Sequence, residues 1–337
     1  MTTPNLSLRS WLRDLVHGWE AFWFTPSDPA TLALIRMLTG AMLFYTHLVW
    51  TIDLEGFFGV HGWLSKDFVY RYHDSPFAWS HLYWIDSPFL LWASHLATLV
   101  VFVALMVGFC SRWAAVLAFL LTVSYAHRAA GALFGLDQIN GFLALYLILG
   151  PCGDAFSVDQ WLRKRKLTGT LPPSVSANLA VRLMQLHLCL VYMFAGFGKL
   201  LGDSWWEGTA LWGAFANYEY QTIDMTWLAG WPGLVNLMTH VSLIWEVSYV
   251  ALVWPRLTRP FVLLLSVPLH LGIALCMGMM TFGLIMIIAN LAFIPPAYVR
   301  HIARKLWPNK NGTLAVEPRE SLASSPHTRR NRRKGVR

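Results

Sequence analysis

Residues 192–208, YMFAGFGKLLGDSWWEG, place a lysine inside an apolar stretch. An ionised side chain near the centre of a bilayer costs about 2.5–3.5 kcal/mol on insertion scales, so Lys199 needs a partner, a water-filled pocket or a route to the interface. Because Lys199 lies one or two turns before the outer end of its segment, snorkelling to the interface and a functional role both remain open.

The residues that precede Lys199 at intervals of three or four fall on one stripe of a helix. That stripe carries Gly196, Tyr192, Cys189, Gln185 and Arg182. Lipid does not tolerate so polar a stripe, so we expect it to face other helices or a cavity.

The composition indicates an integral membrane protein. Of 337 residues, 56% are hydrophobic and only 13% charged, and the mean hydropathy is +0.46, which is too apolar for an ordinary soluble domain. The 18 Trp and 11 Tyr suit the belts that amphipathic rings form at membrane interfaces.

Residues 8–22 do not resemble a signal peptide, because Asp14 and Glu20 interrupt any apolar core. Apolar residues recur there at helical spacing, at Leu8, Trp11, Leu12, Leu15, Trp19 and Phe22. We expect residues 1–26 to contain an amphipathic helix that lies on the membrane surface.

Eight apolar stretches of roughly membrane-crossing length follow. They cover residues 30–51, 88–110, 112–133, 137–152, 178–201, 233–254, 259–277 and 279–297. The fourth is short, and its Gly150-Pro151 end can bend within the protein. The predicted fold is therefore an all-α, polytopic membrane helical bundle of about eight spans, with the transmembrane domain at residues 27–298.

The charges predict the orientation of this bundle. Eight crossings put every basic segment on one side, including residues 163–166 and a tail, 299–337, in which positions 300–337 hold eleven Lys or Arg. Both termini are then cytoplasmic, the tail is a disordered basic segment, and the partners are membrane lipids rather than nucleic acid. The four scattered cysteines predict neither a disulfide framework nor a metal site.

Two long segments, 53–87 and 202–232, then lie on the outer side. Both are rich in aromatic residues and glycine, and the second has no Lys or Arg. We expect short interfacial or re-entrant helices that roof the bundle and close a pocket.

Other polar residues within the apolar stretches need partners. Arg36 is expected to pack near the inner interface or to reach headgroups. Glu246 is expected in an interhelical pair, with Arg182, Lys199 or a histidine as its partner. For His270, a neutral ring hydrogen-bonded between helices is the more frequent case. A single outer cavity could also collect Lys199 and His270 with Asp137, Gln138, Asn140, His127 and Arg128.

Several motifs resemble one family. The segment AGFGKLLGDSWWEG (195–208) is similar to the lysine-containing segment of the vitamin K-dependent γ-carboxylases and of the bacterial horizontally transferred transmembrane (HTTM) proteins. DAFSVD (154–159), LALIRMLTGAMLF (32–44), FFGVHGWLS (57–65) and HLGIALCMGMMTFG (270–283) resemble further family segments in the same order. The resemblance spans roughly residues 20–300.

This resemblance implies a reduced vitamin K or menaquinone as cofactor and a lysine amine that deprotonates it. Oxygen addition then yields a strong base that removes a glutamate γ-proton, and CO2 adds to the carbanion. Lys199 matches that lysine, which must be uncharged, and His270 matches the histidine of a later helix. Asn140 corresponds more loosely to a polar pair of the carboxylases, and Tyr192, Trp205 and Trp206 are expected beside the cofactor. The resemblance also implies a bacterial cytoplasmic membrane.

One departure from the carboxylases is that this chain lacks their large lumenal domain and ends in a basic tail. Three functional hypotheses follow. The first is a quinone-using carboxylase-like lyase. The second is a component that matures or binds a secreted peptide without that chemistry. The third is a transporter, for which the sequence shows no internal repeat.

Overall fold

The computed structural model describes residues 8–73, 77–164 and 172–306, which form helices and no strand. The long helices are α1 (Leu8–Phe24), α2 (Ala30–Trp50), α5 (Pro88–Val107), α6 (Ser111–Arg128), α7 (Gly135–Leu149), α9 (Val175–Leu200), α12 (Pro232–Leu252), α13 (Arg259–Cys276), α14 (Met280–Asn290) and α15 (Pro296–Leu306). The shorter ones are α3 (Leu54–Phe58), α4 (Lys66–His73), α8 (Val158–Lys164), α10 (Asp203–Trp206), α11 (Ala210–Phe215), and the 3-10 turns η1 (Thr51–Asp53), η2 (His81–Trp84), η3 (Ala130–Ala132), η4 (Thr226–Gly230) and η5 (Leu291–Phe293).

The all-α membrane bundle is confirmed, and each of the eight apolar stretches contains a helix. In the described part of the chain, five helical segments are long and apolar enough to cross a membrane: those of α2, α5, α9, α12 and α13. A sixth is reached if α14 and α15, bent by 113°, count as one span. With 15 residues, α7 is about 22 Å long, short of the ~30 Å hydrocarbon layer. The count of eight crossings therefore stays a prediction.

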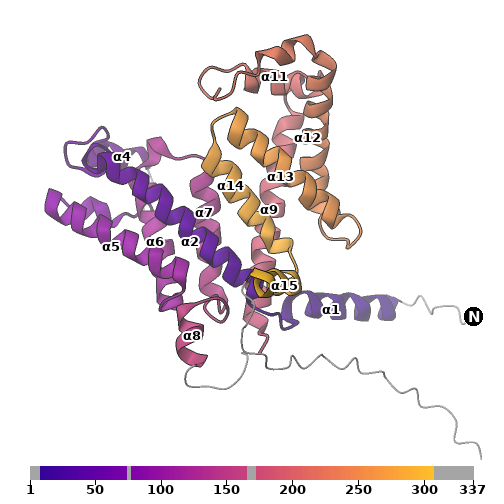
Figure 1. Ribbon diagram of the computed structural model, residues 1–337, viewed down its shortest axis with the longest axis horizontal. Coiled ribbons are helices and arrows are strands. Elements are labelled where there is room, and N and C mark those ends of the chain that lie inside the picture. The colour runs from indigo at the N-terminus through magenta and orange to yellow at the C-terminus, as the bar shows by residue number, and fades with distance from the viewer. Residues whose placement is uncertain (1–7, 74–76, 165–171, 307–337) are drawn as a thin grey trace, which may run out of the picture.

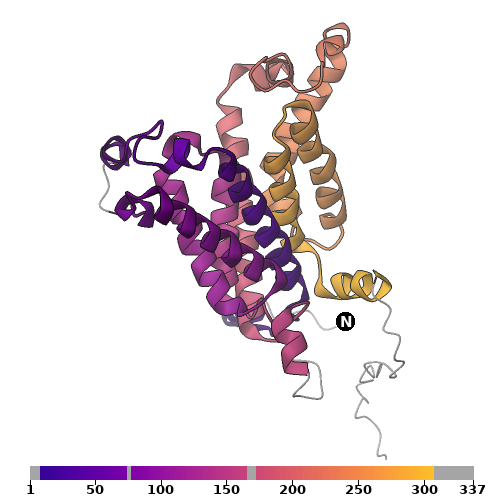
Figure 2. The same ribbon diagram turned by 60° about the vertical axis from the view of Figure 1, so that its left-hand side comes forward.

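The two ends of the bundle differ. Figures 1 and 2 show α1, α8 and α15 at one end, called here the basic end, and α4 and α11 at the other, called the roof end. No residue of α1 is buried, and Trp11, Leu15 and Trp19 expose more than half of their surface. Such a helix suits the membrane surface, as predicted. Of the predicted tail, the first residues belong to α15, and 307–337 lie outside the described residues.

Arg36 of α2 joins several segments at the basic end through hydrogen bonds. Its buried guanidinium donates to the backbone oxygens of Leu105, Met106, Cys152 and Phe156. Of the two expectations for Arg36, packing is correct and headgroup contact is wrong, because four carbonyl groups from the end of α5 and the α7–α8 connection converge on it. The neighbouring Gly108 has φ +73°, and a Cβ atom there would lie 2.6 Å from Arg36 Nη1.

The short segments at the roof end take the predicted form. Residues 53–87 contribute α3, α4 and η2, and residues 202–232 contribute α10, α11 and η4. The second group packs on α9 and α12, which bear Lys199 and Glu246.

Candidate functional site

The site begins with the close approach of α9 and α12. Ser174 caps α9 by accepting a hydrogen bond from Ala177 N at 3.0 Å. The predicted polar stripe of α9 faces inward, since Gly196, Tyr192 and Cys189 are buried. A Cβ atom on Gly196 would lie 3.1 Å from the backbone nitrogen of Val247 in α12. This glycine therefore lets the two helix backbones come close just beneath Lys199.

Lys199 pairs with Glu246 across that contact. The ammonium group donates to both carboxylate oxygens, and the two side chains are 27% and 15% exposed. The nitrogen also lies over the Trp205 ring, 4.9 Å from its centroid. Of the three partners expected for Glu246, the structure selects Lys199. Arg182 instead binds Phe22 O and Gln185 at the basic end.

A cavity of about 350 Å³ opens beside this ion pair. Its walls come from α9, α12 and α13, and α10 and α11 supply the roof through Trp205, Leu211 and Phe215. Most of the lining is apolar. Its polar side chains are Lys199, Ser242, Glu246 and His270. The segment 202–232 thus closes a pocket, as expected.

From the cavity wall, a buried chain of hydrogen bonds leads from His270 into the bundle. His270 Nδ1 lies 2.7 Å from Ser266 O and Nε2 lies 3.2 Å from Tyr192 Oη. Asn290 Nδ2 lies 2.8 Å from the same hydroxyl, and Tyr249 Oη lies 2.8 Å from Asn290 Oδ1. None of His270, Tyr192, Asn290 and Tyr249 is more than 4% exposed.

The hydrogen bonds of this network all point in the same direction, from Tyr249 toward Ser266. Because Ser266 O can only accept, His270 Nδ1 carries the hydrogen, so Nε2 of a neutral ring accepts from Tyr192. Tyr192 in turn accepts from Asn290, whose amide oxygen accepts from Tyr249. A second proton on His270 would leave the Tyr192 hydroxyl hydrogen without an acceptor, which is costly in a buried site. The expected neutral, interhelically bonded histidine is therefore what the geometry favours.

The family model described as the HTTM domain matches residues 24–298 of this chain. The chain belongs to the HTTM family. No curated protein and no solved structure matches it. The match extends from the end of α1 to the start of α15 and so includes the whole helical bundle of this HTTM protein.

The remaining predicted site residues lie at various distances from this HTTM cavity. Trp205 lines it and Tyr192 lies just behind it, bonded to His270. Trp206 is 62% exposed, donates to Leu200 O and is not part of the lining. Asn140 is buried in α7, also outside the lining, and its Oδ1 has no hydrogen-bond partner among the residues that the structure describes.

The expectation of one cavity that collects all outer polar residues is wrong. Lys199 and His270 share a cavity, but Asp137, Gln138, Asn140, His127 and Arg128 do not line it. Asp137 caps its own helix by accepting from Phe134 N, and Arg128 reaches Gly59 O at 3.3 Å. Asp137 therefore stabilises the start of α7, and Arg128 joins the end of α6 to the residue that follows α3.

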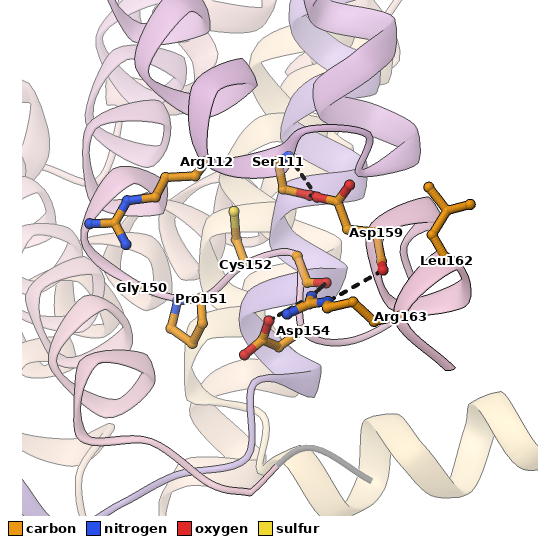
Figure 3. Close-up of a pocket in the computed structure, with 10 residues that line it drawn as sticks. Ser111, Arg112, Gly150, Pro151, Cys152, Asp154, Asp159, Leu162 and Arg163 are labelled. Carbon is orange, nitrogen blue, oxygen red and sulfur yellow. Dashed lines mark hydrogen bonds and ion pairs between the residues drawn. The ribbon is translucent and has the colours of Figure 1, made fainter. Parts of the chain in front are cut away.

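The DAFSVD segment builds a second pocket, of about 550 Å³, at the basic end (Figure 3). Asp159 accepts from Cys110 N, Ser111 N and Ser111 Oγ at 2.6–2.9 Å and so caps α6. Asp154 pairs with Arg163 at 2.7 Å. Both carboxylates are thus engaged in structure, and this HTTM motif organises the end of the bundle far from Lys199.

Sequence reasoning did not single out Asn290 or Tyr249. Asn290 is a lone amide in the last apolar stretch, so the rule that selected Glu246 would have selected it too. Tyr249 gives a weaker signal, because tyrosine is common in this chain.

Proposed function

We propose that this HTTM protein is a membrane enzyme in which Lys199 acts as the base toward a reduced lipid quinone, in a γ-carboxylase-like reaction on a peptide glutamate. The observation that carries the proposal is the Lys199–Glu246 pair in the wall of an apolar cavity. An amine and a carboxylate held together away from bulk water are typical of a site that handles protons.

The cavity is compatible with a quinone ring system. Its volume of about 350 Å³ lies at the lower end of small-molecule sites. Trp205, Phe215 and Trp245 offer flat apolar surfaces for an aromatic head group. Leu237, in the same lining, is 60% exposed on the outside of α12, so an isoprenoid tail could leave toward lipid.

Lys199 can serve as a base only when its amine is neutral. Glu246 provides a place for the proton, because transfer from the ammonium to the carboxylate converts a charged pair into a neutral one, which a water-poor cavity favours. Lys199 Nζ would then accept the proton of a ligand hydroxyl. When bound, a reduced quinone supplies, with O2, the strong base that abstracts a glutamate γ-proton before CO2 adds.

His270 helps to shape the cavity wall and has no free ring nitrogen with which to bind a ligand. Both of its ring nitrogens are engaged, by Ser266 O and by Tyr192. We assign it, with Tyr192 and Asn290, to the rigid wall that holds the ligand against Lys199.

The test is incorporation of labelled CO2 into a glutamate-containing peptide by the purified protein, with reduced vitamin K or menaquinone. Lys199→Met should abolish incorporation. The matched control is Lys66→Met, since Lys66 also pairs with an acid, Asp86, at the roof end. Incorporation by wild type and control but not by Lys199→Met supports the proposal.

Equal incorporation by all three proteins would contradict Lys199 as the base. A folded wild type that binds quinone without incorporating CO2 would contradict carboxylation. It would leave the second hypothesis, maturation or binding of a secreted peptide, as the better account.

A further inference from the structure

Three arginines gather at the basic end, and no described ion pair includes them. Arg182 lies near the start of α9, Arg259 opens α13, and Arg256 lies in the turn between α12 and α13. The five ion pairs among the described residues involve other side chains. The three guanidinium groups therefore carry three positive charges that no carboxylate of the described residues pairs with.

The packing at this end holds the cluster in place. Arg182 donates to Phe22 O at 3.3 Å and stacks 4.3 Å above the Phe22 ring. Phe22 in turn lies 5.6 Å from the Trp254 ring, and Arg259 donates to Val253 O and Trp254 O. Through Phe22 and Trp254, the basic ends of α1, α9 and α12 and the start of α13 thus meet at one point, which brings Arg182 and Arg259 to the same cluster.

Such an arrangement is suited to binding an anion. Arg182 and Arg259 are partly buried, and among the described contacts they donate only to backbone and amide oxygens, so each keeps free N–H groups. Arg256 is exposed and makes no hydrogen bond among the described contacts. Arginine forks match the oxygens of a phosphate better than any other side chain does.

The surroundings indicate a lipid as the source of that phosphate. Large apolar side chains next to the cluster are exposed: Leu257 in the turn before α13, and Phe261 and Leu264 on α13, expose 79%, 70% and 71% of their surface. In a membrane such residues face acyl chains. α1, whose end forms part of the cluster, has the character of a helix at the headgroup level.

We propose that Arg182, Arg256 and Arg259 bind the phosphate group of an anionic phospholipid. The bound lipid ties together the basic ends of α9, α12 and α13, the three helices that also bear Lys199, Glu246 and His270. The site is separate from the quinone cavity and does not depend on the function proposed above.

The experiment is native mass spectrometry of the full-length protein with phosphatidylglycerol or phosphatidylcholine of identical acyl chains. Wild type should retain phosphatidylglycerol selectively. Arg256→Gln is the main variant, because Arg256 makes no hydrogen bond to the framework, so its loss should leave the fold intact. Its affinity for phosphatidylglycerol should fall about fivefold, the effect of one surface charge near an anionic headgroup.

Arg304→Gln is the matched control, since Arg304 is an exposed arginine of α15 at the same end. It should bind as tightly as wild type, and all three proteins should have the same melting temperature in phosphatidylcholine alone. An equal loss in Arg256→Gln and Arg304→Gln would overturn the proposal, because the attraction would then come from general surface charge. Complete displacement of the lipid by millimolar inorganic phosphate would overturn it as well, because the site would then take free phosphate.

Discussion

Gly196 of α9 lies against Val247 of α12 so closely that a Cβ atom at position 196 would contact the Val247 nitrogen at 3.1 Å and its Cγ2 at 3.0 Å. This contact sets the spacing of the two helices one turn below the Lys199–Glu246 pair. Small residues at such crossings are what allow transmembrane helices to approach.

Gly196→Val should therefore separate α9 from α12 and weaken the ion pair. Overpacking of this kind costs about 1–3 kcal/mol. Thermal unfolding in detergent should show a lower midpoint for Gly196→Val, while Gly198→Val serves as control because a Cβ atom there meets nothing within 4 Å. Equal midpoints for the two variants would show that the helices are not in close contact at Gly196.

The ion pair itself is tested by reversing it. Lys199→Glu and Glu246→Lys should each destabilise the protein by about 3 kcal/mol, because each leaves like charges in a partly buried site. The double variant restores opposite charges and should recover most of the stability but none of the CO2 incorporation, since the amine then stands on α12. Failure of the double variant to recover stability would mean that the two side chains do not interact.

Asn290→Leu should disorder the chain that fixes His270. The variant leaves the Tyr249 hydroxyl without its acceptor and Tyr192 without a donor, at about 1–3 kcal/mol for each unpaired buried group. Tyr249→Phe removes one end of the chain and should cost less. Nitrogen chemical shifts of labelled His270 should report one fixed tautomer in wild type and a mixture in Asn290→Leu. A mixture of His270 tautomers in wild type would contradict this network of hydrogen bonds.

Arg36→Met should be the most damaging single change at the basic end. It removes donors from Leu105, Met106, Cys152 and Phe156 at once, and we expect a loss of about 3 kcal/mol or more. Arg112→Met is the control, because Arg112 is an exposed arginine of the same end. Similar expression and melting temperature for the two variants would contradict the stabilising role of the Arg36 hydrogen bonds.

Stability should fall as the pH is lowered from 7 to 5, in part through His81 of η2. Burial lowers the pKa of His81 below its usual value, and its ring is held by Ser94 and Ser124. The unfolded chain then binds a proton near pH 6.5 that the folded protein takes up only at lower pH, so stability present above that pH is lost below it. His81→Gln should flatten the dependence of the melting temperature on pH, and an unchanged dependence would exclude His81 as a contributor.

Much of this architecture follows from sequence because each span and each isolated charge has a local signature. The cost of an ion in lipid singled out Lys199 and Glu246 separately, but sequence left Arg182 and the histidines as equal partners. That choice depends on where α9 and α12 cross, which Gly196 decides in three dimensions.

The incorrect predictions also concern contacts that depend on how the helices pack. Asn140 and Arg128 were grouped with Lys199 because all lie near the same end of their spans, yet that end is wide enough to hold separate clusters. The surroundings of Arg36 could not be predicted either, since its four acceptors lie 69 to 120 residues away along the chain.

The proposed binding of a lipid quinone in the cavity beside Lys199 can be tested by photocrosslinking. A menaquinone analogue with a photoreactive ring, irradiated with the purified protein, should label the lining residues Trp205, Met238 and Met277. Excess unmodified menaquinone should prevent that labelling. Labelling confined to other helices, such as the region of Asn140 in α7, would contradict the account.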